Sequence, residues 1–158
     1  MKFDTAFDNV IGFEGGYTNN PADPGGETMW GITKAVASEN GYTGLMSVMS
    51  RDFAKAIYKA KYWDAIRADE LPDALKYPVF DAAVNSGPKQ AIKWLQRAVG
   101  EQEDGSLGPK TMASVNAMST DAILRRMLAQ RLLFMAALPT WEAFGKGWAR
   151  RVAILLAS

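Results

Sequence analysis

The chain has 158 residues, 48% of them hydrophobic, with 18 Lys and Arg against 17 Asp and Glu. This length supports one ordinary core and is too short for two large independent domains. The chain has no cysteine and no histidine, which excludes disulfides, His-based triads and His-ligated zinc. We therefore expect no metal or other cofactor, and acid–base chemistry must come from Glu, Asp, Tyr or Lys.

The first predicted element is a helix over residues 4–14, which ends where two glycines follow. Phe3, Phe7 and Val10 form an apolar stripe that Glu14 continues at helical spacing. Burial and the negative end of the helix dipole both disfavour a charged carboxylate, so we expect a raised pKa at Glu14. A carboxylic acid protonated near neutral pH is a general acid of the kind that cleaves glycosidic bonds. The alternative is a helix-end Glu that points at solvent.

A loop rich in glycine and proline follows over residues 15–33 and can bring polar groups back toward the end of the helix. In it, Asp23 supplies a second carboxylate and Thr28 a hydroxyl. Tyr17 and Trp30 add flat aromatic faces that suit a sugar ring. Two carboxylates beside a sugar, one as acid and one to position water or stabilise the oxocarbenium ion, are the minimum for glycoside hydrolysis. Each feature alone also has a common structural explanation, such as ordinary turn chemistry.

The remaining chain is predicted to be helices joined by short loops. Helical spacing indicates helices over residues 34–40, 50–63, 79–85, 88–99, from 109, over 120–137, and a last one from 141. The predicted capping residues include Thr33, Ser50 and Thr120, and Gly100 is a predicted stop. Residues 67–78 are acidic and contain proline, so we expect a loop. No segment alternates over more than a few residues. The predicted fold class is therefore mainly α, with at most a small hairpin in the glycine-rich loop.

Some polar and aromatic residues of these helices have two interpretations. Asp81 and Asn85 lie one turn apart on an otherwise apolar helix, so each needs a polar partner. We favour a buried brace between helices for Asp81, whereas a brace and a sugar-binding role are equally supported for Asn85. Tyr62 and Trp63 either form a wall of a substrate groove or end a helix by packing one ring into the core. Trp148 in the last helix is expected in the core.

Motifs spread over nearly the whole chain match one known pattern. They are Glu14-Gly-Gly-Tyr17, Asn20-Pro-x-Asp23-Pro-Gly-Gly-x-Thr28-x-x-Gly31-Ile32-Thr33, Tyr62-Trp63, Phe80-Asp81-x-Ala-Val-Asn85-Ser-Gly87, Leu95-Gln96 and Asp104-Gly105-x-x-Gly108-Pro109-x-Thr111. The first four motifs resemble glycoside hydrolase family 108, a family of N-acetylmuramidases that includes many phage endolysins. The last two resemble the peptidoglycan-binding half that commonly follows the catalytic part in that family.

The resemblance implies a lysozyme-like helical bundle that hydrolyses the β-1,4 bond between N-acetylmuramic acid and N-acetylglucosamine. It places the catalytic Glu of the family on Glu14. In phage-type lysozymes, eight residues separate a Glu from an Asp, and five residues separate that Asp from a Thr. Glu14 and Asp23 fit this pattern, but only four residues separate Asp23 from Thr28. We assign Glu14 as general acid, Asp23 as base or electrostatic partner, and Thr28 as a water-positioning hydroxyl. The substrate-binding candidates are Tyr17, Asn20, Trp30, Tyr62 and Asn85.

Two alternatives to a muramidase remain open. A lytic transglycosylase also uses one protonated Glu but makes an anhydro product. A non-catalytic wall-binding or virion protein on a lysozyme-like scaffold is the alternative from another functional class.

Charge divides the chain into two halves. Residues 1–88 hold 8 Lys and Arg against 12 Asp and Glu, and residues 89–158 hold 10 against 5. No flexible linker separates them, so we expect a catalytic lobe over 1–88 and a helical peptidoglycan-binding lobe over 89–158, packed as one unit. The basic half can aid adsorption to the anionic cell wall, unless arginines such as Arg131 merely form solvated helix faces. An overall charge near zero and no recognition motif argue against nucleic acid.

The N-terminal segment has no apolar region typical of a signal peptide, and no apolar run reaches the roughly 18 residues of a membrane span. We expect no stable membrane insertion, accumulation in the host cytoplasm, and release to the periplasm or cell wall that depends on a holin. The expected partner is the peptidoglycan glycan strand, and the expected oligomeric state is a monomer.

Overall fold

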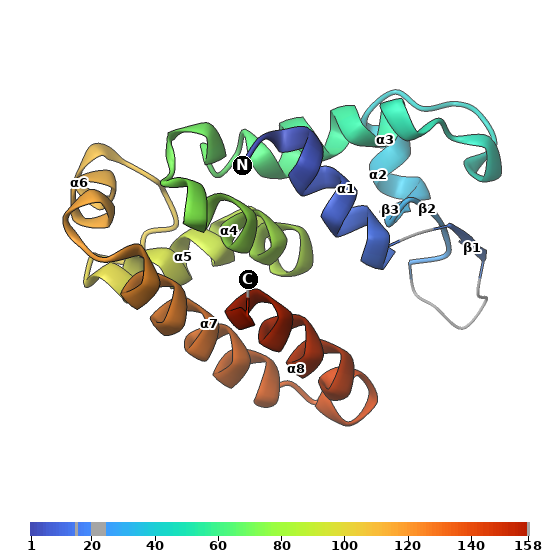
Figure 1. Cartoon of the computed structure of the whole chain (residues 1–158). Coiled ribbons are helices and arrows are strands. Elements are labelled where there is room, and N and C mark those ends of the chain that lie inside the picture. Colours follow the sequence, from blue (N-terminus) through green and yellow to red (C-terminus); the bar gives the residue numbers. More distant parts are fainter. Residues whose placement is uncertain (15, 20–24, 158) are drawn as a thin grey trace.

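The computed structural model describes residues 1–14, 16–19 and 25–157 of the chain. These ranges form a mainly helical molecule with one small sheet (Figure 1). The α-helices are α1 (Phe3–Glu14), α2 (Lys34–Glu39), α3 (Arg51–Tyr58), α4 (Asp73–Ser86), α5 (Pro88–Val99), α6 (Pro109–Ala117), α7 (Thr120–Ala136) and α8 (Trp141–Ala157). Shorter helical segments are η1 (Met46–Val48), η2 (Lys59–Trp63) and η3 (Ala68–Glu70).

The sheet follows α1 and has three antiparallel strands in the order β1-β2-β3. β1 (Tyr17–Asn19) pairs with β2 (Glu27–Met29), and β2 pairs with β3 (Ile32–Thr33). The turn between β2 and β3 contains Trp30 at φ 54° and Gly31 at φ 71°. Two consecutive positive φ angles match the twist of a tight hairpin, which explains how so short a third strand forms. The sheet thus exceeds the predicted hairpin by one short strand.

Local capping signals predicted most helix boundaries correctly. The hydroxyl of Thr33 accepts the amide N–H of Val36 at 3.3 Å and begins α2. The hydroxyl of Ser50 accepts the amide N–H of Phe53 at 3.2 Å and begins α3. Gly100, at φ 78°, ends α5 in the left-handed conformation that glycine adopts without strain. These contacts are formed within a few residues, so the sequence alone specifies them.

The prediction of a loop over residues 67–78 is wrong, because α4 begins at Asp73 and continues through Pro78. Proline inside a helix removes one backbone hydrogen bond and usually kinks or ends the helix. Here Pro78 is buried in line with Leu75 and Val79. Apolar burial of this face therefore outweighs the local penalty.

Two other boundaries differ from the predicted ones. The helix expected over residues 50–63 is α-helical only to Tyr58 and continues to Trp63 with π-helical hydrogen bonding. Thr120, predicted to cap α7, is instead its first helical residue, and Ser119 occupies the capping position.

The main hydrophobic core runs through both halves of the chain. Its fully buried rings include Phe7 of α1, Trp63 of η2, Phe80 of α4 and Trp94 of α5. In Figure 1, α4 and α5 lie at the centre, with α1 and α3 on one side and α7 and α8 on the other. Both α5 and α4 pack on α7, and α8 packs on α7.

The motif around Gln96 holds the loop between α5 and α6. The side-chain amide of Gln96 donates to the Asp104 carboxylate at 2.7 Å and to the Ser106 carbonyl at 3.0 Å. Its carbonyl oxygen accepts the amide N–H of Gly105 at 2.9 Å. Gln96 is 1% exposed, so these bonds satisfy a buried amide. The Gln96 and Asp104-Gly105 motifs are therefore structural.

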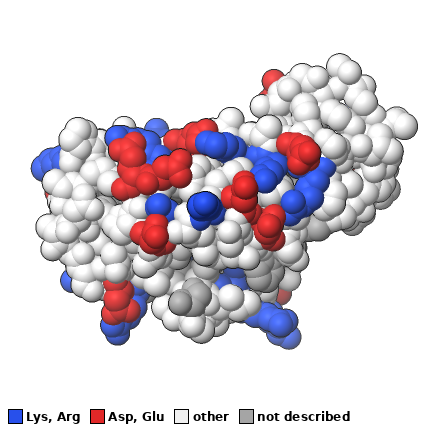
Figure 2. Space-filling view, turned by 45° about the horizontal axis from the view of Figure 1, so that its top comes forward, with Lys and Arg blue, Asp and Glu red and all other residues white. Residues whose placement is uncertain are grey.

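On the face that Figure 2 shows, basic and acidic side chains are interspersed rather than separated by sign. Ion pairs join α1 to α3, with Asp8 and Arg51 2.5 Å apart and Asp4 and Lys55 2.9 Å apart. Such exposed pairs contribute at most about 1 kcal/mol each. Among the described helices, none combines the length and apolarity that a bilayer crossing requires.

Candidate active site

The C-terminal end of α1 brings Glu14 to the edge of the small sheet. Phe7 and Val10 are fully buried and fix α1 against the core. The helix ends at Glu14, and β1 begins three residues later, at Tyr17, after Gly16 with φ 40°. The backbone of Glu14 thus occupies the negative end of the helix dipole. The side chain of Glu14 lies outside the described residues, as do Asp23 and Asn20, so their roles stay predictions.

The β1–β2 hairpin places the candidate residues Tyr17 and Thr28 on opposite faces. Tyr17 donates from its hydroxyl to Glu27 Oε1 at 2.8 Å, a diagonal contact on one face. Thr28 lies directly opposite Thr18, with the two hydroxyl oxygens 2.5 Å apart, on the other face. A substrate that lies along one face of this hairpin therefore contacts only one of the two candidates.

Glu27 connects the hairpin to α2. Lys34 Nζ lies 3.2 Å from Glu27 Oε2. The hydrogen bond from Tyr17, followed by that from Lys34, lowers the pKa of Glu27, and the same bond to Glu27 raises the pKa of Tyr17. These contacts favour the charged form of Glu27 and connect the hairpin to the start of α2. No role for Glu27 is predicted from the sequence. Because Glu27 is next to Thr28 in β2, its side chain lies on the opposite face of the strand from that of Thr28.

Trp30 and Tyr62 are brought together by Tyr58. The indole N–H of Trp30 donates to the carbonyl of Met49 at 2.9 Å, and the hydroxyl of Tyr58 donates to the carbonyl of Trp30 at 3.0 Å. The rings of Tyr58 and Tyr62 have centroids 5.4 Å apart. Both Trp30 and Tyr62 are half-buried and pack against the core. Both rings therefore keep part of their surface exposed, while the indole N–H of Trp30 is already used in a hydrogen bond.

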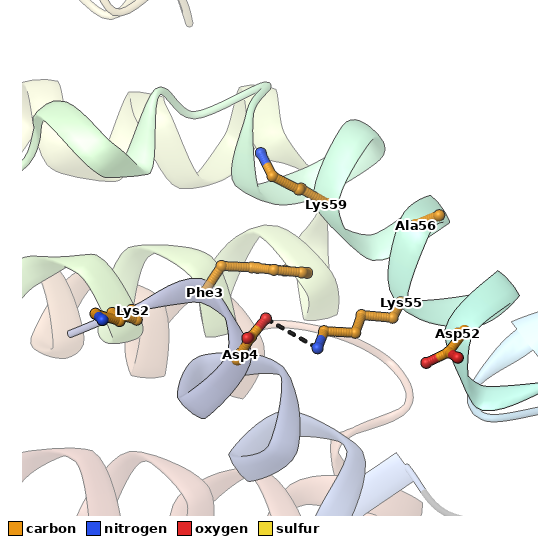
Figure 3. Close-up of a pocket in the computed structure, with 7 residues that line it drawn as sticks. All are labelled: Lys2, Phe3, Asp4, Asp52, Lys55, Ala56 and Lys59. Atoms are coloured by element: carbon orange, nitrogen blue, oxygen red, sulfur yellow. Dashed lines mark ion pairs between the residues drawn. The ribbon is translucent and has the colours of Figure 1, made fainter.

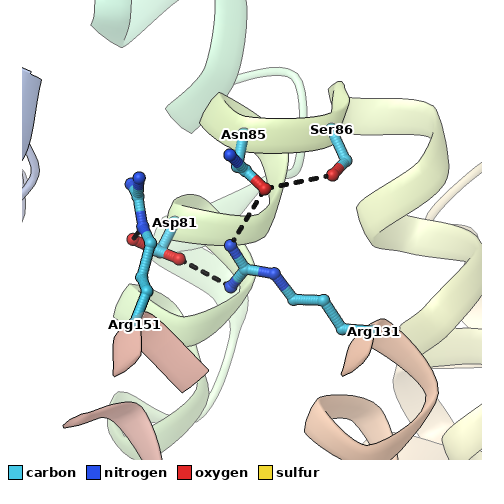
Figure 4. A network of polar contacts seen from close by, with 5 residues as sticks. All are labelled: Asp81, Asn85, Ser86, Arg131 and Arg151. Carbon is cyan, nitrogen blue, oxygen red and sulfur yellow. Dashed lines mark hydrogen bonds and ion pairs between the residues drawn. The ribbon is translucent and has the colours of Figure 1, made fainter. Parts of the chain in front are cut away.

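Asp81 and Asn85 lie at the meeting point of α4, α7 and α8 (Figure 4). Asp81 is fully buried, and its two oxygens accept from Arg131 Nη1 at 2.6 Å and Arg151 Nε at 2.7 Å. This confirms the brace, and it shows that the solvated interpretation is wrong for Arg131, which is 0% exposed. Burial lowers the pKa of Arg131, while Asp81 opposes this effect by favouring the charged form.

Asn85 is exposed at the C-terminal end of α4. Its Oδ1 accepts from Arg131 Nη2 and from the hydroxyl of Ser86, both at 3.4 Å. Figure 4 shows the Asn85 amide nitrogen on the side away from Arg131. This nitrogen has no hydrogen bond to a residue that the structure describes, so it can donate to a ligand.

A groove of about 550 Å³ opens beside Asn85 along α8. Its described lining residues are Asn85, Phe144, Gly147, Trp148, Arg150, Arg151 and Ile154. Trp148, expected in the core, is only half-buried, and Phe144 is 57% exposed. In Figure 1 the N-terminal half of α8, the end of α1 and the sheet all lie toward the right of the molecule.

A second hollow, of about 430 Å³, lies between the start of α1 and α3 (Figure 3). Lys55 in it pairs with Asp4 at 2.9 Å, as Figure 3 shows, and Lys59 pairs with Asp64 at 2.6 Å. Because α1 rises about 1.5 Å per residue, this hollow is far from Glu14 at the other end of the helix. Among the described residues, no three acidic side chains gather to hold a metal ion.

Comparison with known proteins identifies the family. The family model described as Glycosyl hydrolase 108 matches residues 7–87. The chain belongs to glycosyl hydrolase family 108. The model described as Predicted Peptidoglycan domain matches residues 90–153. The solved structure titled "Structure of Brucella abortus SagA" is 36% identical, with a TM-score of 0.89, over 98% of this chain and 91% of that one. No curated protein matches the chain.

These findings make the chain a glycoside hydrolase and support peptidoglycan as its substrate. The predicted fold class, a mainly helical lysozyme-like bundle with a small β element, is confirmed. Within this family 108 chain, the described candidates form two groups. Tyr17, Thr28, Trp30 and Tyr62 lie around the sheet, and Asn85 lies with the α8 groove.

Sequence reasoning missed the α8 groove and the partners of Asp81. One signal was available for Arg131, since this arginine interrupts the apolar stripe of α7 between Met127 and Met135. A charge inside an apolar stripe predicts a buried ion pair. The groove gave no such signal, because its aromatic residues match a core-facing stripe equally well.

Proposed function

We propose that this protein is an N-acetylmuramidase that hydrolyses the β-1,4 bond between N-acetylmuramic acid and N-acetylglucosamine in peptidoglycan. The supporting observation is the family 108 match over residues 7–87, a range that includes Glu14 and Asp23. A peptidoglycan domain match over residues 90–153 in the same chain supports this substrate.

In the proposed reaction, Glu14 is the general acid. Its carboxyl proton moves to the glycosidic oxygen as the bond from that oxygen to the anomeric carbon breaks. Asp23 either stabilises the oxocarbenium ion, while the Glu14 carboxylate takes a proton from the water that adds to the anomeric carbon, or itself accepts that proton. The position of Glu14 at the C-terminal end of α1 favours the protonated acid, because the helix dipole there opposes a negative charge.

Thr28 is the proposed water-positioning group. Its hydroxyl already contacts that of Thr18. A hydroxyl has one donor and two acceptor sites, so Thr28 can hold this contact and still bind a water molecule. Tyr17, Asn20, Trp30, Tyr62 and Asn85 remain the proposed substrate-binding residues.

The proposed biological role is host lysis by a phage. The enzyme accumulates in the host cytoplasm, is released with the help of a holin, and then acts in the periplasm or cell wall as a monomer. Residues 89–158, with 10 basic and 5 acidic residues, favour adsorption to anionic wall polymers over repulsion from them.

The test measures wall hydrolysis by wild type and by Glu14→Gln. We expect Glu14→Gln to lose at least about 100-fold in rate, since general acid catalysis contributes that much, while wall binding and Tm are kept. Glu39→Gln, at an exposed position at the end of α2, is the matched control and should match wild type.

Mass spectrometry of borohydride-reduced products identifies the bond. Reduced muramic acid ends indicate the proposed bond, and reduced glucosamine ends would refute it. Anhydro ends would instead identify a lytic transglycosylase. Equal lysis by Glu14→Gln and wild type would remove Glu14 from its assigned role.

A further inference from the structure

One face of α8 is built as the floor of an open groove. Phe144, Gly147, Trp148 and Arg151 are spaced i, i+3, i+4 and i+7, so they share that face. Asn85, at the end of α4, lines the same groove. The groove therefore connects α8, most of which lies in the peptidoglycan-domain match over residues 90–153, to Asn85, a candidate substrate-binding residue in the family 108 match over residues 7–87.

Gly147 leaves a space in this floor that the packing of the chain does not require. Glycine in a helix interior costs about 1 kcal/mol relative to alanine. A Cβ atom built at Gly147 meets nothing within 4 Å, whereas one at Gly145 lies 2.6 Å from the ring of Trp141. Packing thus explains Gly145 but not Gly147. The missing side chain leaves the α8 backbone at Gly147 open to close approach by a ligand, a use that glycine permits.

The aromatic residues of the groove form a supported platform. Phe144 is 57% exposed and contacts Trp148 with ring centroids 5.8 Å apart. Trp148 in turn contacts Trp141 at 6.2 Å. Exposed aromatic side chains that are held in place by neighbouring rings are typical of ligand contacts, because little entropy is lost when they bind.

The charge of the groove is positive. Arg150 and Arg151 line it, and no acidic residue is among its described lining residues. Arg151 is held by its bond from Nε to Asp81, and Arg150 is exposed without an ion pair to any described residue. Guanidinium groups bind carboxylates in a bidentate manner. Phosphates share this geometry, so the occupant must be chosen from the rest of the site.

We propose that this groove binds the carboxylate-bearing stem peptide of peptidoglycan. This inference rests on the proposed function, because the glycan strand is what brings the stem peptide to the protein. Stem peptides branch from the muramic acid units and carry free carboxylates beside short aliphatic side chains. Arg150 binds a carboxylate, Phe144 covers the aliphatic part, and Gly147 leaves room for the peptide backbone.

The experiment compares Arg150→Gln with Arg125→Gln, an exposed arginine of α7 that does not line the groove. The substrate is soluble glycan with intact stem peptides, used either with free carboxylates or after chemical amidation of them. We expect Arg150→Gln to raise KM about tenfold on the free form, the loss for one charge-assisted hydrogen bond, with kcat within about twofold. On the amidated form the difference between Arg150→Gln and wild type should disappear. Arg125→Gln should behave as wild type on both.

Strands stripped of stem peptides distinguish the two sources of carboxylate, because they keep only the lactyl carboxylate of muramic acid. An Arg150→Gln defect that persists on stripped strands would overturn the assignment to the stem peptide. Equal KM for Arg150→Gln and Arg125→Gln on the free form would refute the claim that the groove binds substrate through Arg150. Gly147→Leu provides a second variant: it should raise KM on the free form without lowering Tm, because leucine is a better helix former than glycine.

A binding measurement separates this inference from the proposed function. The Glu14→Gln protein is titrated calorimetrically with a synthetic stem tripeptide of alanine, glutamate and diaminopimelate. We expect binding that the added Arg150→Gln change weakens about tenfold. The tripeptide has no glycosidic bond, so such binding supports the groove even if the proposed reaction fails. If the tripeptide does not bind while wild type still hydrolyses the wall, stem-peptide binding in the groove is refuted and the proposed function is not.

Discussion

Removal of charges from the Asp81 network should show how strongly α4 is bound to α7 and α8. Asp81 is fully buried, and the Arg131 side chain is 1% exposed. Their atoms lie 2.6 Å apart, and Arg151 contacts the other carboxylate oxygen at 2.7 Å. One buried carboxylate therefore has two cationic partners from two helices.

The size of each effect follows from what each substitution leaves behind. Loss of one partner of a buried ion pair costs about 3–5 kcal/mol of unfolding free energy. Arg131→Met leaves Asp81 with Arg151, so we expect a loss of about 3 kcal/mol, the lower end of that range. Asp81→Asn leaves two guanidinium groups without the carboxylate between them, so we expect about 5 kcal/mol, the upper end.

Urea denaturation at neutral pH measures these free energies. In the double variant Asp81→Asn/Arg131→Met, the two losses should fall short of additivity by about 2 kcal/mol, since both remove the same contact. Arg125→Met is the matched control, because Arg125 also lies on α7 but pairs at the surface with Asp121. It should cost at most about 0.5 kcal/mol. Additive losses, or a loss at Asp81 no larger than at Arg125, would refute this account.

Two further predictions concern Tyr77 and Gly145. Burial, followed by the charge of Asp81, raises the pKa of Tyr77 to about 12. The folded protein then keeps a proton that the unfolded chain releases above about pH 10, so the stability of wild type relative to Tyr77→Phe should fall as the pH rises from about 10 to 12. A constant difference, in denaturant melts across that range, would contradict this. Gly145→Ala should lower Tm because its Cβ would lie 2.6 Å from the Trp141 ring, whereas Gly147→Ala should raise it; the reverse order would contradict the packing described for α8.

The sequence predicted those parts of the fold that are determined locally. Thr33 and Ser50 cap helices where expected, and Gly100 ends one, because each of these contacts spans only a few residues. The start of α4 was missed because the local penalty of Pro78 is outweighed by burial against elements far away in the chain. Burial of that kind is absent from any local pattern.

The candidate site was predictable to a smaller extent. The helix that ends at Glu14 and the aromatic residues around the glycine-rich loop were found from spacing and composition. The partners of Asp81 are 50 and 70 residues away in sequence, so no periodicity could pair them. The opposite faces of Tyr17 and Thr28 likewise depend on strand register, which a loop rich in glycine does not specify.

Buried residues connect the second half of the chain to the first. The larger of the two core clusters among the described residues extends from Ala6 in α1 to Met127 in α7, so residues 1–88 do not bury a core of their own. The carboxylate of Asp81, in the match over residues 7–87, is paired with Arg131 and Arg151, in the match over residues 90–153. A domain that only held the enzyme on its substrate would need neither the shared core nor these ion pairs. We therefore expect changes in α8 to alter KM through the groove and stability through Asp81, so the two effects can be separated by substituting Arg150 and Arg131 in turn.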